Sequence, residues 1–205
     1  ASSKFYSKKP KNIIGVTGTN GKSSIANFYF QILSQNKIKV ASIGTLGIKT
    51  ISSKTNVTNT TLDPIKLSFH LDKLKKQNID NVILEASSHG LKQNRLNGLN
   101  FKTALFTNLS HDHLDYHKNF RNYLNAKLYL FKKLLNKKSN IITDITIPEY
   151  KKIKKISLRN KLNLKTIGVG KGDLNIITHE YVREKQVIKI KYKNNFYNFE
   201  TNLIG

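Results

Sequence analysis

The 205-residue chain contains no cysteine, so it can form neither a disulfide bond nor a thiolate metal site. This absence fits a reducing compartment. No apolar run approaches the roughly 18 residues that a membrane-spanning helix needs. The first residues also lack the apolar segment of a signal peptide. We therefore expect a cytoplasmic protein without a membrane partner, long enough for one domain with a full hydrophobic core.

Acidic residues are scarce, since 12 Asp and Glu stand against 36 Lys and Arg and give a formal net charge of +24. A charge of this size first suggests nucleic acid as a partner. However, the basic residues are almost all lysines spread along the chain, and Asn and Ile are abundant too, as a codon bias toward AT would produce. The aromatic-rich basic motif of an RNA-binding sheet is missing. We therefore expect no nucleic-acid partner, and a basic surface that favours polyanionic ligands such as nucleotides.

Apolar runs that alternate with helical segments predict an α/β fold, in which a doubly wound, mostly parallel sheet binds ligands at the carboxyl ends of its strands. After about residue 173 the pattern changes, and the runs at 176–177 and 187–192, with a polar turn at 193–195, predict a small antiparallel region near the C-terminus. The strands of the main sheet are expected at residues 12–17, 40–43, 81–85, 103–107, 140–143 and 165–169.

Three segments have the spacing of amphipathic helices. One follows Lys22, and another covers about 119–136. The third begins at Asp63-Pro64, where a capping side chain precedes proline at the first helical position. On the helix that follows Lys22, the side chains expected to share the buried face are Ile25, Phe28, Tyr29, Ile32 and Leu33.

A glycine-rich turn, Gly18-Thr19-Asn20-Gly21-Lys22-Ser23, joins the first strand to the first helix. The backbone N–H groups of such a turn face an anion. The spacing predicts that Lys22 reaches the terminal phosphates of ATP and that the Ser23 hydroxyl binds Mg²⁺. The strict phosphate-loop pattern needs glycine at position 16, which is Val16 here. The turn is therefore either a variant phosphate loop or an ordinary strand-to-helix turn.

Two groups of polar side chains follow other predicted strands. Glu85 ends the third strand, beside the phosphate loop. Its carboxylate either holds Mg²⁺ or is simply exposed to solvent at the end of the strand. The segment 110–117 places three histidines and two aspartates within eight residues. These side chains either bind a metal, or Asp112 or Asp115 caps the next helix.

Lys127 lies within the apolar face of the helix predicted over 119–136, at about 100° per residue. Its side chain either extends along the helix to bring the ammonium into solvent, or it is partly buried and functional, because burial favours the neutral, reactive amine. The apolar residues that surround it on this face are Phe120, Tyr123, Leu124, Phe131 and Leu134.

Together these residues resemble the Mur ligases, the cytoplasmic enzymes that build the peptide of the bacterial cell-wall precursor. The loop at 18–23 is similar to the variant phosphate loop of that family. Further segments resemble the family member that adds the third residue of the peptide, and the resemblance runs from about Phe5 to Gly205. These segments are 85–91 with Gln93 and Arg95, 59–61 and 107–117.

The resemblance implies an ATP-dependent ligase of peptidoglycan synthesis, which serves cell-wall biogenesis, cell shape and cell division. Its substrate would be UDP-N-acetylmuramoyl-L-alanyl-D-glutamate, and its product would gain a diamino acid such as meso-diaminopimelate or L-lysine. ATP would convert the glutamate side chain to an acyl phosphate that the incoming amine attacks. We expect such an enzyme to be a monomer.

The resemblance also implies a role for individual positions. Residues expected to bind ATP are Gly18, Thr19, Asn20, Gly21, Lys22, Ser23, Ser24 and Asn108. Residues expected to surround Mg²⁺ are Ser23, Glu85, His113 and Lys127, with Lys127 carbamylated by CO₂, and the last three act in catalysis together with Lys22. Residues expected to contact the UDP-muramoyl dipeptide are Asn59, Thr60, Thr61, Ser87, Gln93 and Arg95.

The chain departs from the family pattern in two places: Ser23 replaces the usual Thr, and 143–145 replaces the usual Asn-Asp-Asp. Residues 1–11 would be a linker from an N-terminal domain, and 12–205 the central ATP-binding domain. The family's C-terminal domain, which binds the diamino acid, would be missing. We therefore expect little ligase turnover from this chain alone.

The sequence motifs allow two alternative functions. One is a related ATP-dependent ligase such as folylpolyglutamate synthase, against which the segment 87–91 argues. The other is a basic nucleic-acid-binding ATPase with a phosphate loop, in which neither the segment 110–117 nor Lys127 has a role.

Overall fold

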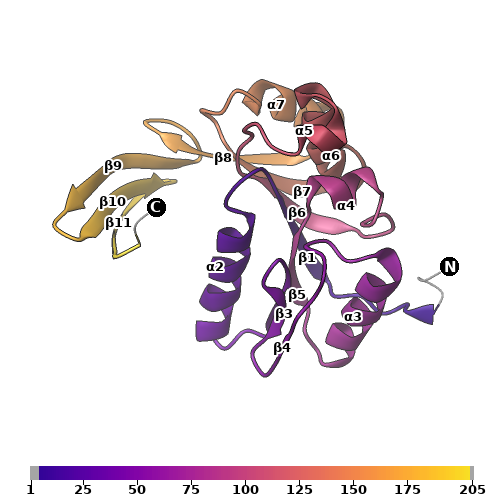
Figure 1. Cartoon of the computed structure of the whole chain (residues 1–205). Coiled ribbons are helices and arrows are strands. Elements are labelled where there is room, and N and C mark those ends of the chain that lie inside the picture. The colour runs from indigo at the N-terminus through magenta and orange to yellow at the C-terminus, as the bar shows by residue number, and fades with distance from the viewer. Residues whose placement is uncertain (1–4, 204–205) are drawn as a thin grey trace.

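The computed structural model describes residues 5–203, which form an eleven-stranded sheet with its helices (Figure 1). The predicted linker 1–11 and domain 12–205 therefore extend beyond the described residues. No helix among these residues is both long enough and apolar enough to cross a membrane. The strands are β1 Asn12–Thr17, β2 Val40–Gly44, β3 Gly47–Thr50, β4 Lys54–Thr55, β5 Asn81–Glu85, β6 Phe101–Phe106, β7 Leu135–Asp144, β8 Asn163–Val169, β9 Leu174–Val182, β10 Lys185–Tyr192 and β11 Asn195–Thr201. The helices are α2 Lys22–Gln35, α3 Pro64–Lys76, α4 Ser88–Lys92, α5 Leu114–His117, α6 Phe120–Lys133 and α7 Tyr150–Arg159.

The strands follow the order β11-β10-β9-β8-β7-β6-β1-β5-β2-β3-β4. From β2 to β9 every neighbouring pair is parallel. The pairs at both ends of the sheet, β2–β3–β4 and β9–β10–β11, are antiparallel. The predicted fold class is therefore confirmed, including the antiparallel region near the C-terminus, which projects from the body of the molecule in Figure 1.

Helices cover both faces of the central strands, because the apolar runs of a parallel sheet must be buried on two sides. The larger core cluster contains leucines of α3 and α6 and the isoleucines of α7. The smaller cluster contains Val16 and Ile83 of the sheet and Ala26 of α2. The carboxyl ends of the parallel strands are left free at one edge of this layered structure.

The buried face of α2 differs from the expected one. Ala26 and Phe30 are buried, whereas Phe28 and Ile32 are 41% and 60% exposed. Because α2 packs on its side of the sheet through a small cluster with β1 and β5, only a narrow stripe of the helix is covered. The expected five-residue apolar face was therefore wrong at Phe28 and Ile32.

The boundary between α6 and β7 also differs from the expectation. The helix ends at Lys133, and the strand begins at Leu135 instead of residue 140. A shift in the pairing of β6 and β7 between Phe101 and Thr103 accommodates the additional residues of β7. The elements that the pattern did not indicate are the short β3, β4, α4 and α5, the strand β11, and α7, whose apolar side chains are few among its lysines.

Helix α3 begins as predicted. The Asp63 carboxylate accepts hydrogen bonds from the backbone N–H groups of Ile65 at 3.1 Å and Lys66 at 3.0 Å. The side chain of Leu71 is 0% exposed in the core, and that of Ile65 on the same helix is 64% exposed.

We predict that Leu71→Ala lowers the free energy of unfolding by about 2–5 kcal/mol, because it removes buried methyl groups and leaves a cavity. The matched control is Ile65→Ala, which should change that free energy by less than about 0.5 kcal/mol. Urea denaturation of the three proteins measures both effects. Equal losses in the two variants would contradict the packing of α3 described above.

Candidate functional site

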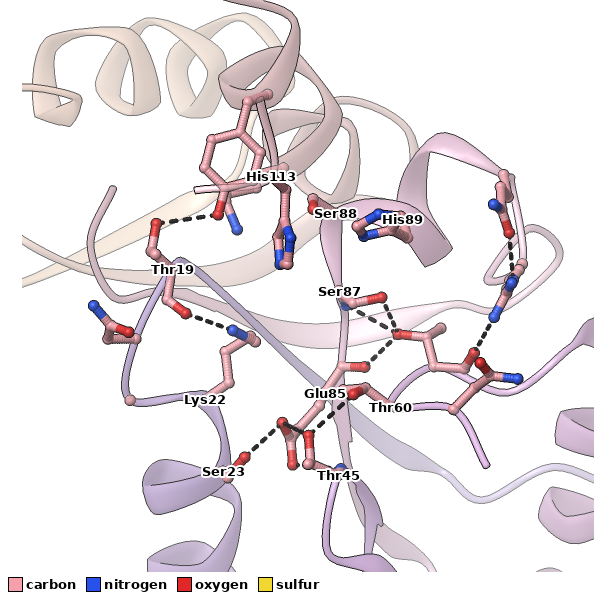
Figure 2. A pocket seen from close by; sticks show the side chains of 18 of the residues that line it. Thr19, Lys22, Ser23, Thr45, Thr60, Glu85, Ser87, Ser88, His89 and His113 are labelled. Atoms are coloured by element: carbon pink, nitrogen blue, oxygen red, sulfur yellow. Dashed lines mark hydrogen bonds between the residues drawn. The ribbon is translucent and has the colours of Figure 1, made fainter. Parts of the chain in front are cut away.

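The central parallel strands bring distant parts of the sequence together at their carboxyl ends. Strand β1 lies between β5 and β6, and β2 lies on the other side of β5. The loops that follow these strands surround a cavity of about 500 Å³ (Figure 2). Its lining residues are Thr19, Asn20, Gly21, Lys22, Ser23, Ser24, Thr45, Asn59, Thr60, Thr61, Glu85, Ser87, Ser88, His89, Gln93, Arg95, His113, Tyr123 and Lys127.

The glycine-rich turn lies at the rim of this cavity and is held by the segment after β6. The Asn108 carbonyl accepts a hydrogen bond from the Thr19 N–H at 2.9 Å, and the Asn108 side chain accepts one from the Asn20 N–H at 2.9 Å. Gly18 has φ +150°, and a Cβ atom there would overlap the Thr107 side chain. Asn108 and Gly18 therefore shape the loop, although neither lines the cavity.

Glu85 is buried, with 2% of its surface exposed, so it is not a solvated strand end. One carboxylate oxygen accepts hydrogen bonds from the hydroxyls of Ser23 at 2.8 Å and Thr45 at 3.1 Å. The other oxygen accepts a bond from the Thr45 N–H at 3.0 Å. No ion pair to Glu85 is found among the described residues. The carboxylate therefore faces the loop with three hydrogen bonds and no direct cationic partner.

Two lysines donate hydrogen bonds to carbonyls of the loop. The Lys22 ammonium donates to the carbonyls of Gly18 at 3.1 Å and Thr19 at 2.7 Å. The Lys127 ammonium donates to the same Gly18 carbonyl at 2.6 Å and lies 4.3 Å from the centre of the Tyr123 ring. Lys127 is 1% exposed. The alternative in which its side chain extends to solvent is therefore wrong.

Burial and charge both act on these two lysines. Burial, and secondly the nearby charge of Lys22, lower the pKa of Lys127 from 10.5 to about 7. Burial also lowers the pKa of Lys22, and the negative charges of Glu85 and Asp112 partly oppose this effect. A large fraction of Lys127 is therefore in the neutral amine form at neutral pH.

The histidine-rich segment 110–117 does not form a metal site by itself. Among residues 5–203, no group of three or more His, Asp, Glu or Cys side chains is arranged to hold a metal ion. His113 lines the cavity, whereas His117 is buried at 2% exposure. The rings of both residues pack against that of His89, at 4.8 and 5.6 Å. Burial, and then the charge of His89, lower the pKa of His117 to about 4, so this ring is neutral.

The alternative role of this segment, capping of the next helix by an aspartate, is wrong. Asn119 caps α6, because its side chain accepts a hydrogen bond from the Asn122 N–H at 2.9 Å. Helix α5 begins after His113, which makes no capping hydrogen bond through its side chain. Asp112 instead lies 3.3 Å from the His113 ring nitrogen.

The residues expected to bind the dipeptide lie together in the lining of the cavity. The Thr61 hydroxyl donates to the Glu85 carbonyl and contacts the Ser87 hydroxyl, at 2.8 and 2.9 Å. Arg95 donates to the Thr61 carbonyl at 2.7 Å and to the Gln93 side chain at 2.8 Å. Asn59 and Thr60 complete this group in the lining of the cavity. Expected nucleotide and substrate residues therefore share one cavity.

Four further residues line the cavity without having been assigned to it from the sequence: Thr45, Ser88, His89 and Tyr123. Thr45 directly follows β2, the neighbour of β5 in the sheet. The rule that ligands bind at the carboxyl ends of parallel strands could have identified it. The ring of His89 packs 4.8 Å from that of His113 and 4.1 Å from that of Tyr116, which no sequence pattern indicates.

Comparisons with known proteins show what the chain is similar to. The Mur ligase middle domain matches residues 16–205. A UDP-N-acetylmuramoyl-L-alanyl-D-glutamate–2,6-diaminopimelate ligase of Rickettsia montanensis is 42% identical over 98% of this chain and 43% of its own length. The solved structure of a ligase of the same name has a TM-score of 0.87 at 30% identity, over 99% of this chain and 42% of that one. The chain thus spans less than half the length of these relatives.

A more distant structure shares the fold alone. Mycobacterium tuberculosis folylpolyglutamate synthase complexed with ADP has a TM-score of 0.70 at 13% identity, over 93% of this chain and 49% of that one.

We predict that the free energy of unfolding of the wild type, minus that of Lys127→Met, increases from about pH 7 toward pH 10. Because the pKa of Lys127 falls from 10.5 to about 7 on folding, unfolding takes up protons between these values, and stability rises with pH by up to about 1.4 kcal/mol per unit. Urea denaturation at pH 7 and pH 9 in CO₂-free buffers measures this difference. Lys132→Met, exposed on the same helix, is the control. Parallel curves for the wild type and Lys127→Met would contradict the burial effect.

Proposed function

Because the chain belongs to the Mur ligase family, we propose that it is the ATP-binding central part of a ligase that extends UDP-N-acetylmuramoyl-L-alanyl-D-glutamate by a diamino acid. The names of its relatives favour 2,6-diaminopimelate as the added residue. The observation that carries this proposal is the single cavity that contains the loop of Lys22, the carboxylate of Glu85, the buried Lys127 and the group around Arg95. We place the enzyme in the cytoplasm, where the family acts, as a monomer.

The loop would hold the phosphates of ATP. Its backbone N–H groups and the N-terminus of α2 supply donors and a positive electrostatic end for an anion. Lys22 would exchange the carbonyls of Gly18 and Thr19, to which it donates in this structure, for the stronger acceptors of the terminal phosphates. The ADP bound in the distant folylpolyglutamate synthase structure supports a nucleotide in this fold.

Mg²⁺ fits the oxygen atoms beside the loop. The Ser23 hydroxyl and the Glu85 carboxylate are hard ligands that lie 2.8 Å apart, and His113 lines the same cavity. The ammonium of Lys127 is a cation and cannot bind a metal. Its carbamate with CO₂ would be an anionic oxygen ligand, and the neutral amine that reaction needs is favoured by the lowered pKa of Lys127. When bound, Mg²⁺ would reduce the repulsion between the triphosphate and the substrate carboxylate.

The group of Thr60, Thr61, Ser87, Gln93 and Arg95 would orient the dipeptide so that its glutamate carboxylate meets the terminal phosphate of ATP. Transfer of that phosphate would give an acyl phosphate and ADP. Attack by the amine of the diamino acid would then form the amide and release phosphate. The role of this chain is to hold and orient the two anions, which contributes through positioning and electrostatic stabilisation.

We also propose that residues 1–11 are a linker and that 12–205 are the central domain of a longer enzyme. Other domains would bind the UDP end of the substrate and the diamino acid. The 205-residue chain alone would therefore bind nucleotide but show little ligase turnover.

We predict that Lys22→Ala weakens the binding of Mg-ATP by about tenfold to a hundredfold, because it removes a charge-assisted contact worth about 1.5–3 kcal/mol. Isothermal titration calorimetry measures the affinity. Lys133→Ala, which removes an exposed lysine of α6 outside the cavity, should leave it unchanged. If Lys22→Ala binds Mg-ATP as tightly as the wild type, the loop assignment is incorrect.

A further inference from the structure

A groove on the outer side of the molecule lies between α6 and α7, which pack beside each other (Figure 1). Each helix contributes one stripe of side chains at helical spacing. The stripe of α6 consists of Arg121, Leu124, Asn125, Leu128 and Lys132, and that of α7 consists of Lys152, Lys155, Ile156 and Arg159. The groove has a volume of about 340 Å³ and is separate from the cavity of the candidate site.

The groove combines an apolar floor with a basic rim. Leu124, Leu128 and Ile156 form the floor, and all three are largely buried. The five cationic side chains of the stripes are exposed around it. None of the five forms an ion pair within the described part of the chain. No carboxylate lines the groove, so its positive charge has no counterpart in this structure.

The general excess of lysine does not account for the arginines in this groove. Only four of the chain's basic residues are arginines, and two of them, Arg121 and Arg159, line it. A third, Arg95, lines the candidate site. The planar guanidinium binds carboxylates and phosphates through paired hydrogen bonds, which a lysine cannot match. The two arginines therefore favour recognition of an anionic group at this place.

The groove is held in one shape. The Asn160 side chain, directly after α7, donates hydrogen bonds to the carbonyls of Phe131 at 3.3 Å and Lys132 at 3.1 Å. These bonds fix the end of α7 against the end of α6. A ligand would therefore meet a largely formed groove, which lowers the cost of ordering on binding.

The shape and chemistry of the groove select among anionic partners. No aromatic side chain of residues 5–203 lines it, so these residues offer no stacking surface for nucleic-acid bases there. A flat lipid surface would not reach a concave apolar floor between two helices. A helix with apolar side chains on one face and carboxylates on its flanks would match both the floor and the rim. We propose that the α6–α7 groove binds an acidic amphipathic segment of a partner protein.

The probe for this proposal is a short fluorescein-labelled peptide with leucine on one helical face and glutamate on the flanks. Fluorescence anisotropy at constant ionic strength measures its binding to the 205-residue chain. Lys152→Glu/Lys155→Glu, which reverses two rim charges, should weaken binding at least about tenfold. The control is Lys151→Glu/Lys154→Glu, which has the same charge change on the same helix outside the groove and should weaken binding less than about threefold.

Two further measurements distinguish binding of the peptide in the groove from general electrostatic attraction to the basic surface. Arg121→Gln/Arg159→Gln tests the rim without introducing acidic residues, and it should also weaken binding of the peptide. A second peptide, in which glutamine replaces every leucine, should bind at least about tenfold more weakly if the apolar floor is used. Circular dichroism melts confirm that each variant is folded.

Three results would overturn the proposal. One is an equal loss of affinity in the groove variant and its charge-matched control. Another is equal binding of the two peptides. The third is binding to phosphatidylglycerol vesicles without binding to the leucine peptide, which would indicate a lipid surface instead.

Discussion

The site depends on one constraint, the burial of the Glu85 carboxylate at the carboxyl end of β5. None of the cationic side chains of residues 5–203 forms an ion pair with it. An ionised group that leaves water loses several kcal/mol of solvation unless it is paired or hydrogen-bonded. Here the compensation comes from Ser23, at the start of α2, and from Thr45, just after β2. These bonds connect three parallel strands at one edge. Gly44 is part of the same arrangement, since a Cβ atom there would overlap the carboxylate.

The positive charges of the site are arranged around a single backbone carbonyl. The Gly18 oxygen accepts from both Lys22 and Lys127, so two amino groups lie close to the loop. The Glu85 carboxylate lies beside the same loop, bonded to Ser23 (Figure 2). Burial lowers the pKa of each lysine, and the charge of Lys22 lowers the pKa of Lys127 further. The cavity therefore offers positive charge for phosphates and, beside it, oxygen ligands for a metal ion.

The sequence predicted the fold well where the signal was local. Six of the strands in the parallel part of the sheet are the predicted apolar runs, and Asp63-Pro64 begins α3 as expected. The outward positions of Phe28 and Ile32 could not be predicted, because contacts with the sheet decide which stripe of α2 is buried. Lys127 and Glu85 were recognisable because a charged residue within an apolar pattern is unusual. Thr45 was missed although it directly follows a predicted strand, whereas only the path of the chain brings His89 to the cavity.

The most direct measurement of the role of Glu85 is the effect of Mg²⁺ on ATP affinity in the wild type and in Glu85→Gln. Calorimetric titrations with excess Mg²⁺ and with EDTA would give this effect for each protein. If Glu85 holds the ion, Mg²⁺ strengthens ATP binding to the wild type, and this increase is largely lost in the variant, whose neutral amide is a weaker ligand. An equal effect of Mg²⁺ on both proteins would show that the buried carboxylate is not a metal ligand.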